Sequence, residues 1–271
     1  MTTERVKSFY TDHVRQEWRR LDKDAYSRLE FETTLHYLDK YLPEQGLVLD
    51  AGGGPGRYTL ALARRGYDVV LLDFTPANLE FARRRIRRAG LRRRVVDVVE
   101  GSITDLSRFA DGTFDAVLCS GGPLSHVVDA TERQRALGEL VRVAKPGAPL
   151  LVSVMSRLAV LVLDLLIAQH ALELDHFRPM RDTGDFPGET GFTACHFFLP
   201  EEFQAELSRQ PVELLEMVGL EGISAHHRRE LKQVAKNPAR WKVWLETHYA
   251  TCTHPAVVGM SEHILAVCRK R

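Results

Sequence analysis

The stretch VLDAGGGPGRYTLALARRG, residues 48–66, constrains the fold most, because it places four glycines in five positions between an apolar run and a helical pattern. The apolar run is typical of a buried strand, and Gly66 follows the helical residues as a stop signal. In an open parallel sheet, the first strand-to-helix turn lies where ligands bind. Glycines in that turn let the backbone approach the ligand closely. The stretch therefore predicts an α/β sheet with a ligand site at this turn.

The remaining chain continues the alternation of strands and helices. Further apolar, strand-like runs occupy residues 68–74, 95–102, 114–122, 145–155, 212–220 and 263–270, and helical patterns lie between them. Continuous apolar strands separated by amphipathic helices are typical of a parallel sheet covered on both faces. We therefore expect an α/β fold with a seven-stranded, mostly parallel sheet and helices on both of its faces.

Two segments fall outside this rhythm and predict a helical cap. Residues 1–40 are helical in pattern and precede the first strand, and residues 157–199 are rich in aromatic, histidine and turn-forming residues. We read the whole chain, residues 1–271, as a single domain capped by these two segments. The apolar run at 158–168 is about half as long as a bilayer span, so a buried helix is expected there. His176 and Arg178 offer a polar lining for a substrate.

The glycine spacing excludes two common nucleotide sites. The glycines fall at 52, 54 and 56, and Arg57 stands where the dinucleotide-binding pattern G-x-G-x-x-G needs its third glycine. No G-K-[ST] sequence follows, so a Walker phosphate loop is also absent. Asp50, at the end of the first strand, would repel a pyrophosphate and favour a cationic ligand.

At this stretch the sequence resembles the class I S-adenosylmethionine-dependent methyltransferases. Their first motif reads acid-x-G-x-G-x-G and is matched by Asp50, Gly52, Gly54 and Gly56. The resemblance spans residues 45–155 and returns in the last two strands. It implies a Rossmann-like fold, S-adenosyl-L-methionine as the cofactor, and transfer of a methyl group to an O, N or S atom of a small molecule.

The resemblance also implies roles for single residues. Asp73 ends the second strand, where the family places an acid on the ribose hydroxyls, and Phe74 would lie against the adenine. After the third strand, Ser102 would meet the adenine amino group and Ile103 the ring, although Asp105 competes with Ser102. Ser120 would approach the methionine portion. In the amino-terminal segment, Arg28 or Tyr10 would meet the cofactor carboxylate or the acceptor.

His126 follows the fourth strand, where family members place groups that face both cofactor and acceptor. A neutral imidazole can remove a proton from an acceptor hydroxyl or amine, so we expect His126 to act as a base and to contact the substrate. Alternatively, His126 caps or orients its loop. Methyl transfer is an in-line displacement in which positioning can dominate, so a base is not obligatory.

Charge and cysteine usage bound the partners. The formal net charge is +1, which favours a small-molecule acceptor over a nucleic acid or a membrane. Eight arginines between residues 83 and 94, and a carboxyl-terminal resemblance to enzymes that modify an anticodon uridine, keep a tRNA substrate as an alternative. A cofactor-binding protein without catalysis is a third reading. Four dispersed cysteines and a polar amino terminus predict a cytoplasmic protein without a metal site, and no signal indicates an oligomeric state.

Overall fold

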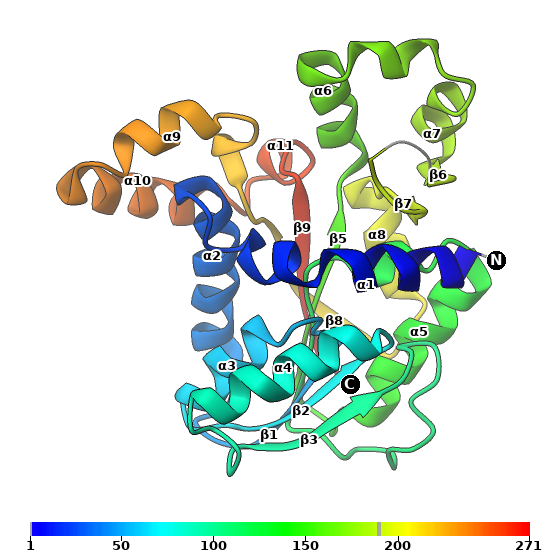
Figure 1. The fold of residues 1–271 in the computed structure, drawn as a ribbon, viewed down its shortest axis with the longest axis vertical. Coiled ribbons are helices and arrows are strands. Elements are labelled where there is room, and N and C mark those ends of the chain that lie inside the picture. Colours follow the sequence, from blue (N-terminus) through cyan, green and yellow to red (C-terminus); the bar gives the residue numbers. More distant parts are fainter. Residues whose placement is uncertain (1, 189–190) are drawn as a thin grey trace.

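The computed structural model describes residues 2–188 and 191–271, and its centre is a seven-stranded sheet of order β3-β2-β1-β4-β5-β9-β8 (Figure 1). The strands are β1 (Leu47–Ala51), β2 (Asp68–Asp73), β3 (Val95–Glu100), β4 (Ala116–Cys119), β5 (Pro149–Met155), β8 (Val212–Gly219) and β9 (His263–Lys270). Only β9 runs antiparallel to its two neighbours. The predicted seven-stranded, mostly parallel sheet is confirmed.

Helices cover both faces of this sheet, as the continuous apolar strands predicted. One face carries α2 (Ala25–Tyr41), α3 (Arg57–Arg64) and α4 (Pro76–Arg88), and the other carries α5 (Ala130–Val143) and α8 (Pro200–Ser208) (Figure 1). Each layer of helices buries its own apolar cluster against the strands, with Leu49 and Val152 on one face and Val48 and Leu71 on the other. This packing fixes the carboxyl ends of β1, β2 and β4 relative to one another.

Helix α5 begins at an acidic cap, because its N-cap residue is Asp129. Its carboxylate accepts from the backbone N–H groups of Thr131 and Glu132, at 2.9 and 3.0 Å. A charged acceptor makes stronger hydrogen bonds to these groups than a threonine hydroxyl does.

Three segments lie above the carboxyl ends of the strands. Helix α1 (Thr2–Arg20) crosses them, whereas α2 packs on the side of the sheet (Figure 1). The insertion at 157–199, of which 189–190 fall outside the described residues, forms a lobe with α6 (Arg157–Ile167), η2 (Gln169–Glu173), α7 (Phe177–Thr183), β6 (Asp185–Phe186) and β7 (Cys195–His196). A second lobe, between β8 and β9, holds η3 (Gly222–Ser224), α9 (Arg228–Val234), α10 (Pro238–Thr251) and α11 (Pro255–Val258).

Helix α6 corrects one expectation. The apolar run at 158–168 was expected to be buried, yet only Arg157 and Ala159 of α6 are buried. Its end is open to solvent, with Leu165, Leu166 and Ile167 exposed by 59%, 55% and 76%. Apolar composition alone could not reveal this, because it does not say whether another element packs against the helix. Among the described residues, no helix has the length and apolar character needed to cross a membrane.

Candidate functional site

A cavity of about 780 Å³ lies at the carboxyl ends of β1, β2 and β4, beneath α1. This volume is within the range of sites that bind cofactors and small molecules. Its walls come from α1, the glycine turn after β1, the ends of β2 and β3, the segment after β4 that contains η1 (Leu124–His126), the start of α5, and Asp185 of β6. The sequence-predicted residues that line it are Tyr10, Gly52, Gly54, Asp73, Phe74, Ser102, Ile103, Ser120 and His126, whereas Asp50, Gly56 and Arg28 do not.

The glycine turn needs glycine for two different reasons. Gly52, Gly54 and Gly56 all have positive φ, at 73°, 55° and 84°, a region that residues with a side chain rarely adopt. At Gly52 a side chain would also collide, because a Cβ there would lie 2.6 Å from Pro123. At Gly54 a Cβ would meet nothing closer than 3.8 Å, so this glycine leaves open space on the cavity side.

Gly52→Ala is expected to destabilise the fold more than Gly66→Ala. Gly66 has a φ of 96°, but nothing lies within 4 Å of the position that a Cβ would take, so its substitution costs only backbone strain, about 1 kcal/mol. Gly52→Ala adds the collision with Pro123 and should cost more than about 3 kcal/mol. Urea unfolding of both variants measures the difference. Equal losses would mean that the turn relaxes around Pro123.

Asp50 lies beneath the glycine turn rather than in the cavity. It is fully buried, accepts a hydrogen bond from the Thr59 hydroxyl at 2.5 Å, and does not line the cavity. A Cβ on Gly53 would sit 2.5 Å from its carboxyl carbon, which shows that the backbone covers it. Burial raises the pKa of Asp50 to about 6. Asp50 was expected to attract a cationic ligand directly, but it does not reach the cavity. It supports the glycine turn from below.

Asp73 joins the end of β2 to the glycine turn. One oxygen accepts from the backbone N–H of Gly54 at 2.9 Å, and the other accepts from Thr75 N–H at 2.8 Å and from the Asn78 amide at 3.3 Å. Burial raises its pKa, while these hydrogen bonds oppose that shift. The side chain is 4% exposed and still lines the cavity. Its orientation is thus fixed before any ligand enters.

Phe74, Ser102 and Ile103 lie together on the neighbouring wall of the cavity. Ile103 is buried, and the Ser102 hydroxyl is 2.8 Å from that of Thr104. Asp105, the competitor of Ser102, is exposed, accepts from Ser107 N–H at 3.0 Å and does not line the cavity. The structure therefore brings Ser102, and not Asp105, to this wall.

Arg28 was expected to contact the cofactor, but the structure places Arg20, and not Arg28, at the cavity. Arg28 is exposed, pairs with Glu32 at 3.6 Å and lies over the Trp241 ring. The chain turns between α1 and α2, so the first turn of α2 faces α10 rather than the cavity. Arg20, at the end of α1, lines the cavity beside Ser120. Sequence reasoning missed it because it is one of five arginines in the first 40 residues.

Arg20 is held from one side and open on the other. Its Nε donates to Glu17 at 2.9 Å and its Nη1 donates to Glu30 at 2.6 Å. Its Nη2 approaches Gly121, where a Cβ would lie 3.2 Å away. Burial disfavours the charge of Arg20, but Glu17 and Glu30 outweigh it and raise the pKa of the guanidinium. A fixed cation therefore faces the cavity next to the end of β4.

His126 and Tyr10, which both line the cavity, form a hydrogen-bonded pair. The Tyr10 hydroxyl is 2.7 Å from His126 Nε2, and His126 Nδ1 is 3.0 Å from the Ala194 carbonyl. A carbonyl only accepts, so Nδ1 carries the proton and Nε2 accepts from Tyr10. Burial lowers the pKa of His126 and raises that of Tyr10. The pair therefore holds a neutral imidazole with its lone pair directed at a hydroxyl.

The insertion contributes other residues than the sequence indicated. His176 packs edge-on against Phe186, Arg178 is exposed, and neither lines the cavity. Helix α7 buries Met180 in an apolar cluster with Met155 and Phe197, which leaves Arg178 on the outer side. Instead, Asp185 lines the cavity, and the Ala194 carbonyl holds His126. His176 and Arg178 therefore lie outside the lining of this cavity, and their contact with a substrate stays a prediction.

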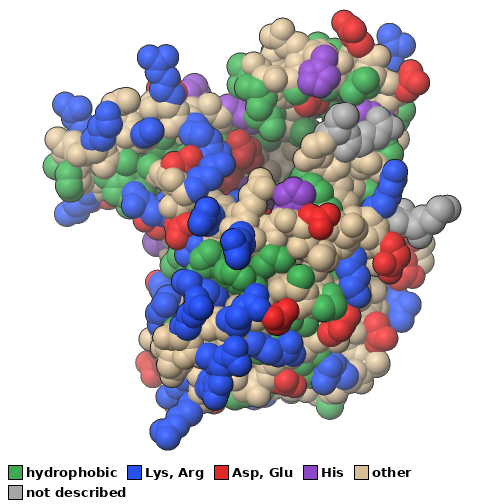
Figure 2. Space-filling model, viewed as in Figure 1, with side chains coloured by type: hydrophobic (Ala, Val, Ile, Leu, Met, Phe, Trp, Pro, Cys, Tyr) green, Lys and Arg blue, Asp and Glu red, His purple; other side chains and the backbone are tan. Residues whose placement is uncertain are grey.

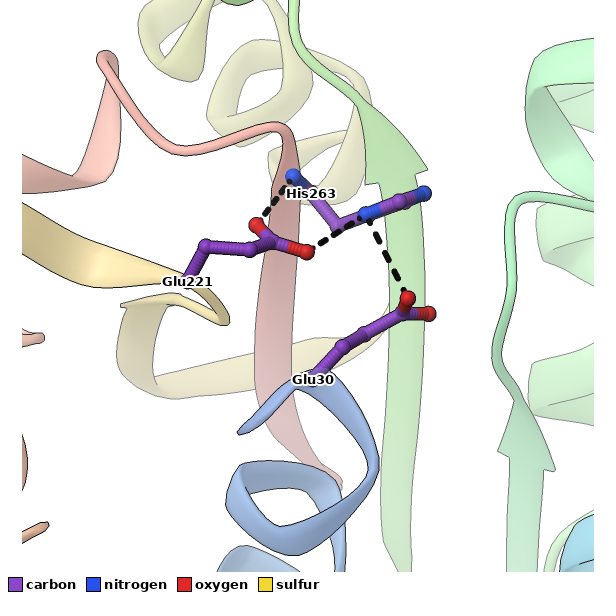
Figure 3. A group of neighbouring side chains, drawn as sticks. All are labelled: Glu30, Glu221 and His263. Carbon is purple, nitrogen blue, oxygen red and sulfur yellow. Dashed lines mark hydrogen bonds and ion pairs between the residues drawn. The ribbon is translucent and has the colours of Figure 1, made fainter. Parts of the chain in front are cut away.

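Behind Arg20, the side chains of Glu30, Glu221 and His263 converge from three elements (Figure 3). Their nearest ligand-type atoms all lie within 4.8 Å of one another, the only such group of His, Cys, Asp and Glu among residues 2–188 and 191–271. His263 Nδ1 donates to Glu221 at 2.8 Å, and Arg20 Nη1 donates to Glu30 at 2.6 Å. Since two cationic groups already neutralise these carboxylates, we describe the group as an ionic network rather than a metal centre.

The arginine cluster at 83–94 adds to a basic face around α4 (Figure 2). Part of it has structural partners: Arg83 donates to the Val98 carbonyl, Arg85 lies over the Trp18 ring and Arg94 pairs with Asp68. Arginine side chains that are already engaged by their own fold are less available to bind phosphates.

An open α/β sheet with a glycine turn, an acid ending the second strand and a covering helix defines a Rossmann-like protein that binds a small ligand at its switch point. A family model described as a methyltransferase domain matches residues 48–147. A demethylmenaquinone methyltransferase of Thermobifida fusca is 39% identical over 147 residues, which cover 54% of this chain and 57% of that relative. By first motif and domain match over residues 48–147, and by fold, the chain is similar to the class I S-adenosylmethionine-dependent methyltransferases.

Solved structures show how widely this fold is shared. A SAM-dependent methyltransferase from Methanosarcina mazei superposes with a TM-score of 0.59 at 22% identity, covering 86% of this chain and 96% of that one. The [4+2]-cyclase SpnF superposes with a TM-score of 0.56 at 19% identity, covering 89% and 80%. Fold alone therefore does not define the reaction. The chain also spans only slightly more than half the length of the curated relative named above.

Proposed function

We propose that this chain is an S-adenosylmethionine-dependent methyltransferase that acts on a small-molecule acceptor. The observation that carries the proposal is the cavity itself, which is lined by a fixed carboxylate, a glycine turn and a neutral histidine–tyrosine pair. The similar family uses S-adenosylmethionine as its cofactor, and the residues of the cavity fit this molecule. A carboxylate that can accept from the ribose diol, an apolar wall and a cation all line the cavity. The small-molecule class is further favoured by the name of the similar relative, a demethylmenaquinone methyltransferase.

The cofactor would extend from Asp73 to Arg20. Asp73 would accept the ribose hydroxyls, because its two oxygens suit a diol. Phe74 and Ile103 would enclose the adenine, with Ser102 near its amino group. Ser120 and Arg20 would hold the amino-acid portion, since a guanidinium binds a carboxylate well. We assign to Arg20 the role that the sequence suggested for Arg28.

S-adenosylmethionine, when bound, supplies an electrophilic methyl group for displacement by a nucleophile. Tyr10 and His126 would handle the proton that the nucleophile loses. The Tyr10 oxygen would accept this proton while its own proton passes to His126 Nε2, which leaves an imidazolium whose Nδ1–H still donates to Ala194. Because burial raises the pKa of Tyr10, a free tyrosinate is disfavoured and the two transfers are expected to be concerted.

A product screen tests this proposal and its alternatives. The purified chain is incubated with S-adenosylmethionine and either a panel of phenols, hydroquinones and amines or tRNA whose anticodon uridine carries the carboxylate-bearing modification without its methyl group, and release of S-adenosylhomocysteine is measured. Turnover with a small molecule supports the proposal. Turnover with tRNA alone would indicate a tRNA substrate, which the basic face in Figure 2 would then bind. Cofactor binding without turnover of these substrates, or of any compound in a cell extract, would indicate a non-catalytic binding protein.

We propose a cytoplasmic location for the chain. Its buried, unpaired cysteines agree with this location.

Arg20→Met is expected to lower the affinity for S-adenosylhomocysteine by about tenfold to thirtyfold, because it removes a charged hydrogen bond to the carboxylate. Arg28→Met, the matched control in the next helix, should leave affinity within about twofold. Isothermal titration calorimetry on both folded variants gives the comparison. A larger loss in Arg28→Met than in Arg20→Met would return the carboxylate contact to Arg28.

A further inference from the structure

A line of alternating charges runs from the cavity into the protein interior. It begins at Arg20, whose Nη1 donates to Glu30 at 2.6 Å, and continues to His263, whose Nδ1 lies 3.9 Å from Glu30. His263 Nδ1 in turn donates to Glu221 at 2.8 Å (Figure 3). Of these four residues, Arg20 alone lines the cavity. The other three therefore touch the cavity contents only through Arg20.

The inner end of this line is rigidly held. Glu221 is 1% exposed, and its second oxygen accepts from the Ser261 hydroxyl at 2.7 Å and from the His263 backbone N–H at 2.9 Å. Glu30 is 4% exposed and belongs to α2, whereas Arg20 belongs to α1. The line thus connects α1, α2 and the start of β9, and a fixed inner end can set the position of a long, otherwise mobile arginine side chain.

His263 balances two buried carboxylates. Burial lowers its pKa, but Glu30 and Glu221 outweigh burial and raise the pKa to about 9, against a smaller opposing effect of Arg20. Other titratable groups nearby are Glu262, the preceding residue, and His226, which lies 3.5 Å from Glu262 and whose pKa is lowered by burial. Tyr26 and His248 interact with Glu221 from α2 and α10. At neutral pH His263 is therefore an imidazolium. Without this charge, Glu30 would depend on Arg20 alone, and the positive potential of Arg20 toward the cavity would fall.

We propose that Glu221, His263 and Glu30 form a positioning unit that holds Arg20 ready for the carboxylate of the cofactor's amino-acid portion. This inference rests on the proposed function, because it presupposes that the cavity takes S-adenosylmethionine. It assigns a role in ligand recognition to three residues that lie outside the acid-x-G-x-G-x-G motif. The unit acts on the carboxylate end of the ligand and leaves the nucleoside end unaffected.

Two ligands separate this role from a general structural role. S-adenosylhomocysteine carries the carboxylate, and S-adenosyl-3-thiopropylamine is the same molecule without it. His263→Gln and Glu30→Gln should weaken S-adenosylhomocysteine binding by about tenfold or more, and change binding of the decarboxylated ligand by less than about twofold. The matched control is His36→Gln, which removes another histidine of the same helix as Glu30, one that stacks on Tyr249 with ring centroids 4.1 Å apart. It should leave the ratio of the two affinities unchanged.

The pH dependence of ligand preference provides a second readout, which is measured first on the wild-type protein. The raised pKa of His263 means that its proton is present in the folded protein up to a pH of about 9. The preference of the wild-type protein for the carboxylate ligand should therefore fall as pH rises through that value. In His263→Gln the preference should be low and lose this step, while titration of the ligands' own amino groups remains the same in both proteins.

The outcomes distinguish failure of the inference from failure of the proposed function. If the wild-type protein binds neither ligand, the proposed function is wrong. If it binds both, but His263→Gln and Glu30→Gln weaken both ligands equally or not at all, the positioning role is wrong. A wild-type preference that stays constant through the titration of His263 also overturns it. Circular dichroism and urea unfolding show whether each variant is folded before binding is measured.

Discussion

Asp73→Ala is expected to lower the affinity for S-adenosylhomocysteine by about tenfold to hundredfold, since each hydrogen bond from a ligand to a charged group contributes about 1.5–3 kcal/mol. The upper end is expected here because the same carboxylate also accepts from Gly54 N–H, Thr75 N–H and the Asn78 amide. Its removal would loosen the glycine turn as well as the ribose contact. Isothermal titration calorimetry measures the loss.

Two controls separate the ribose contact from the support of the turn. Asp73→Asn retains one oxygen, so it should keep part of the backbone hydrogen bonding and bind with intermediate affinity. Asp105→Ala removes a nearby exposed acid outside the cavity and should leave affinity unchanged within about twofold. Unchanged affinity in a folded Asp73→Ala protein would place the ribose elsewhere.

The sheet and its glycine turn could be predicted because both arise from local patterns. A buried parallel strand needs a continuous apolar run, and a tight turn at its end needs glycines with positive φ, so β1 and the turn at Gly52 and Gly54 are visible in a short window. Asp73 could be placed in the same way, because it directly ends the second apolar run. Residues that follow a strand inherit their position from the sheet.

The cap could not be predicted at the same level, because its residues are placed by packing between distant segments. His176 and Arg178 lie on a helix whose apolar side faces Met155 and Phe197, and composition does not indicate which side that is. Likewise, Arg20 is held at the cavity by Glu17 from its own helix and by Glu30 from α2, a contact between helices that the sequence does not reveal. Asp50 fits the family motif, but only the folded backbone shows that Gly53 covers it.

Tyr10→Phe is expected to lower the turnover number by about a hundredfold or more on an acceptor that loses a proton, while cofactor affinity stays within about threefold. The substitution keeps the ring and removes the hydroxyl that donates to His126 Nε2 at 2.7 Å. His126→Asn should cause a similar loss, and the double variant should be no slower than the slower single variant, because both residues belong to one proton path. Initial rates with the acceptor found in the product screen give these values.

The pH profile tests which group accepts the proton. Burial lowers the pKa of His126 from its ordinary value of 6.5, so the imidazole is still neutral and able to accept a proton at pH 6.5. Wild-type turnover should therefore fall only in more acidic solution. His126→Asn should lose this acidic limb. Tyr67→Phe is the matched control, because it removes a hydroxyl that donates to the Pro43 carbonyl, remote from the cavity. If Tyr10→Phe and Tyr67→Phe turn over equally fast, methyl transfer proceeds through positioning alone, and the Tyr10–His126 pair only anchors α1 to the insertion through the Ala194 carbonyl.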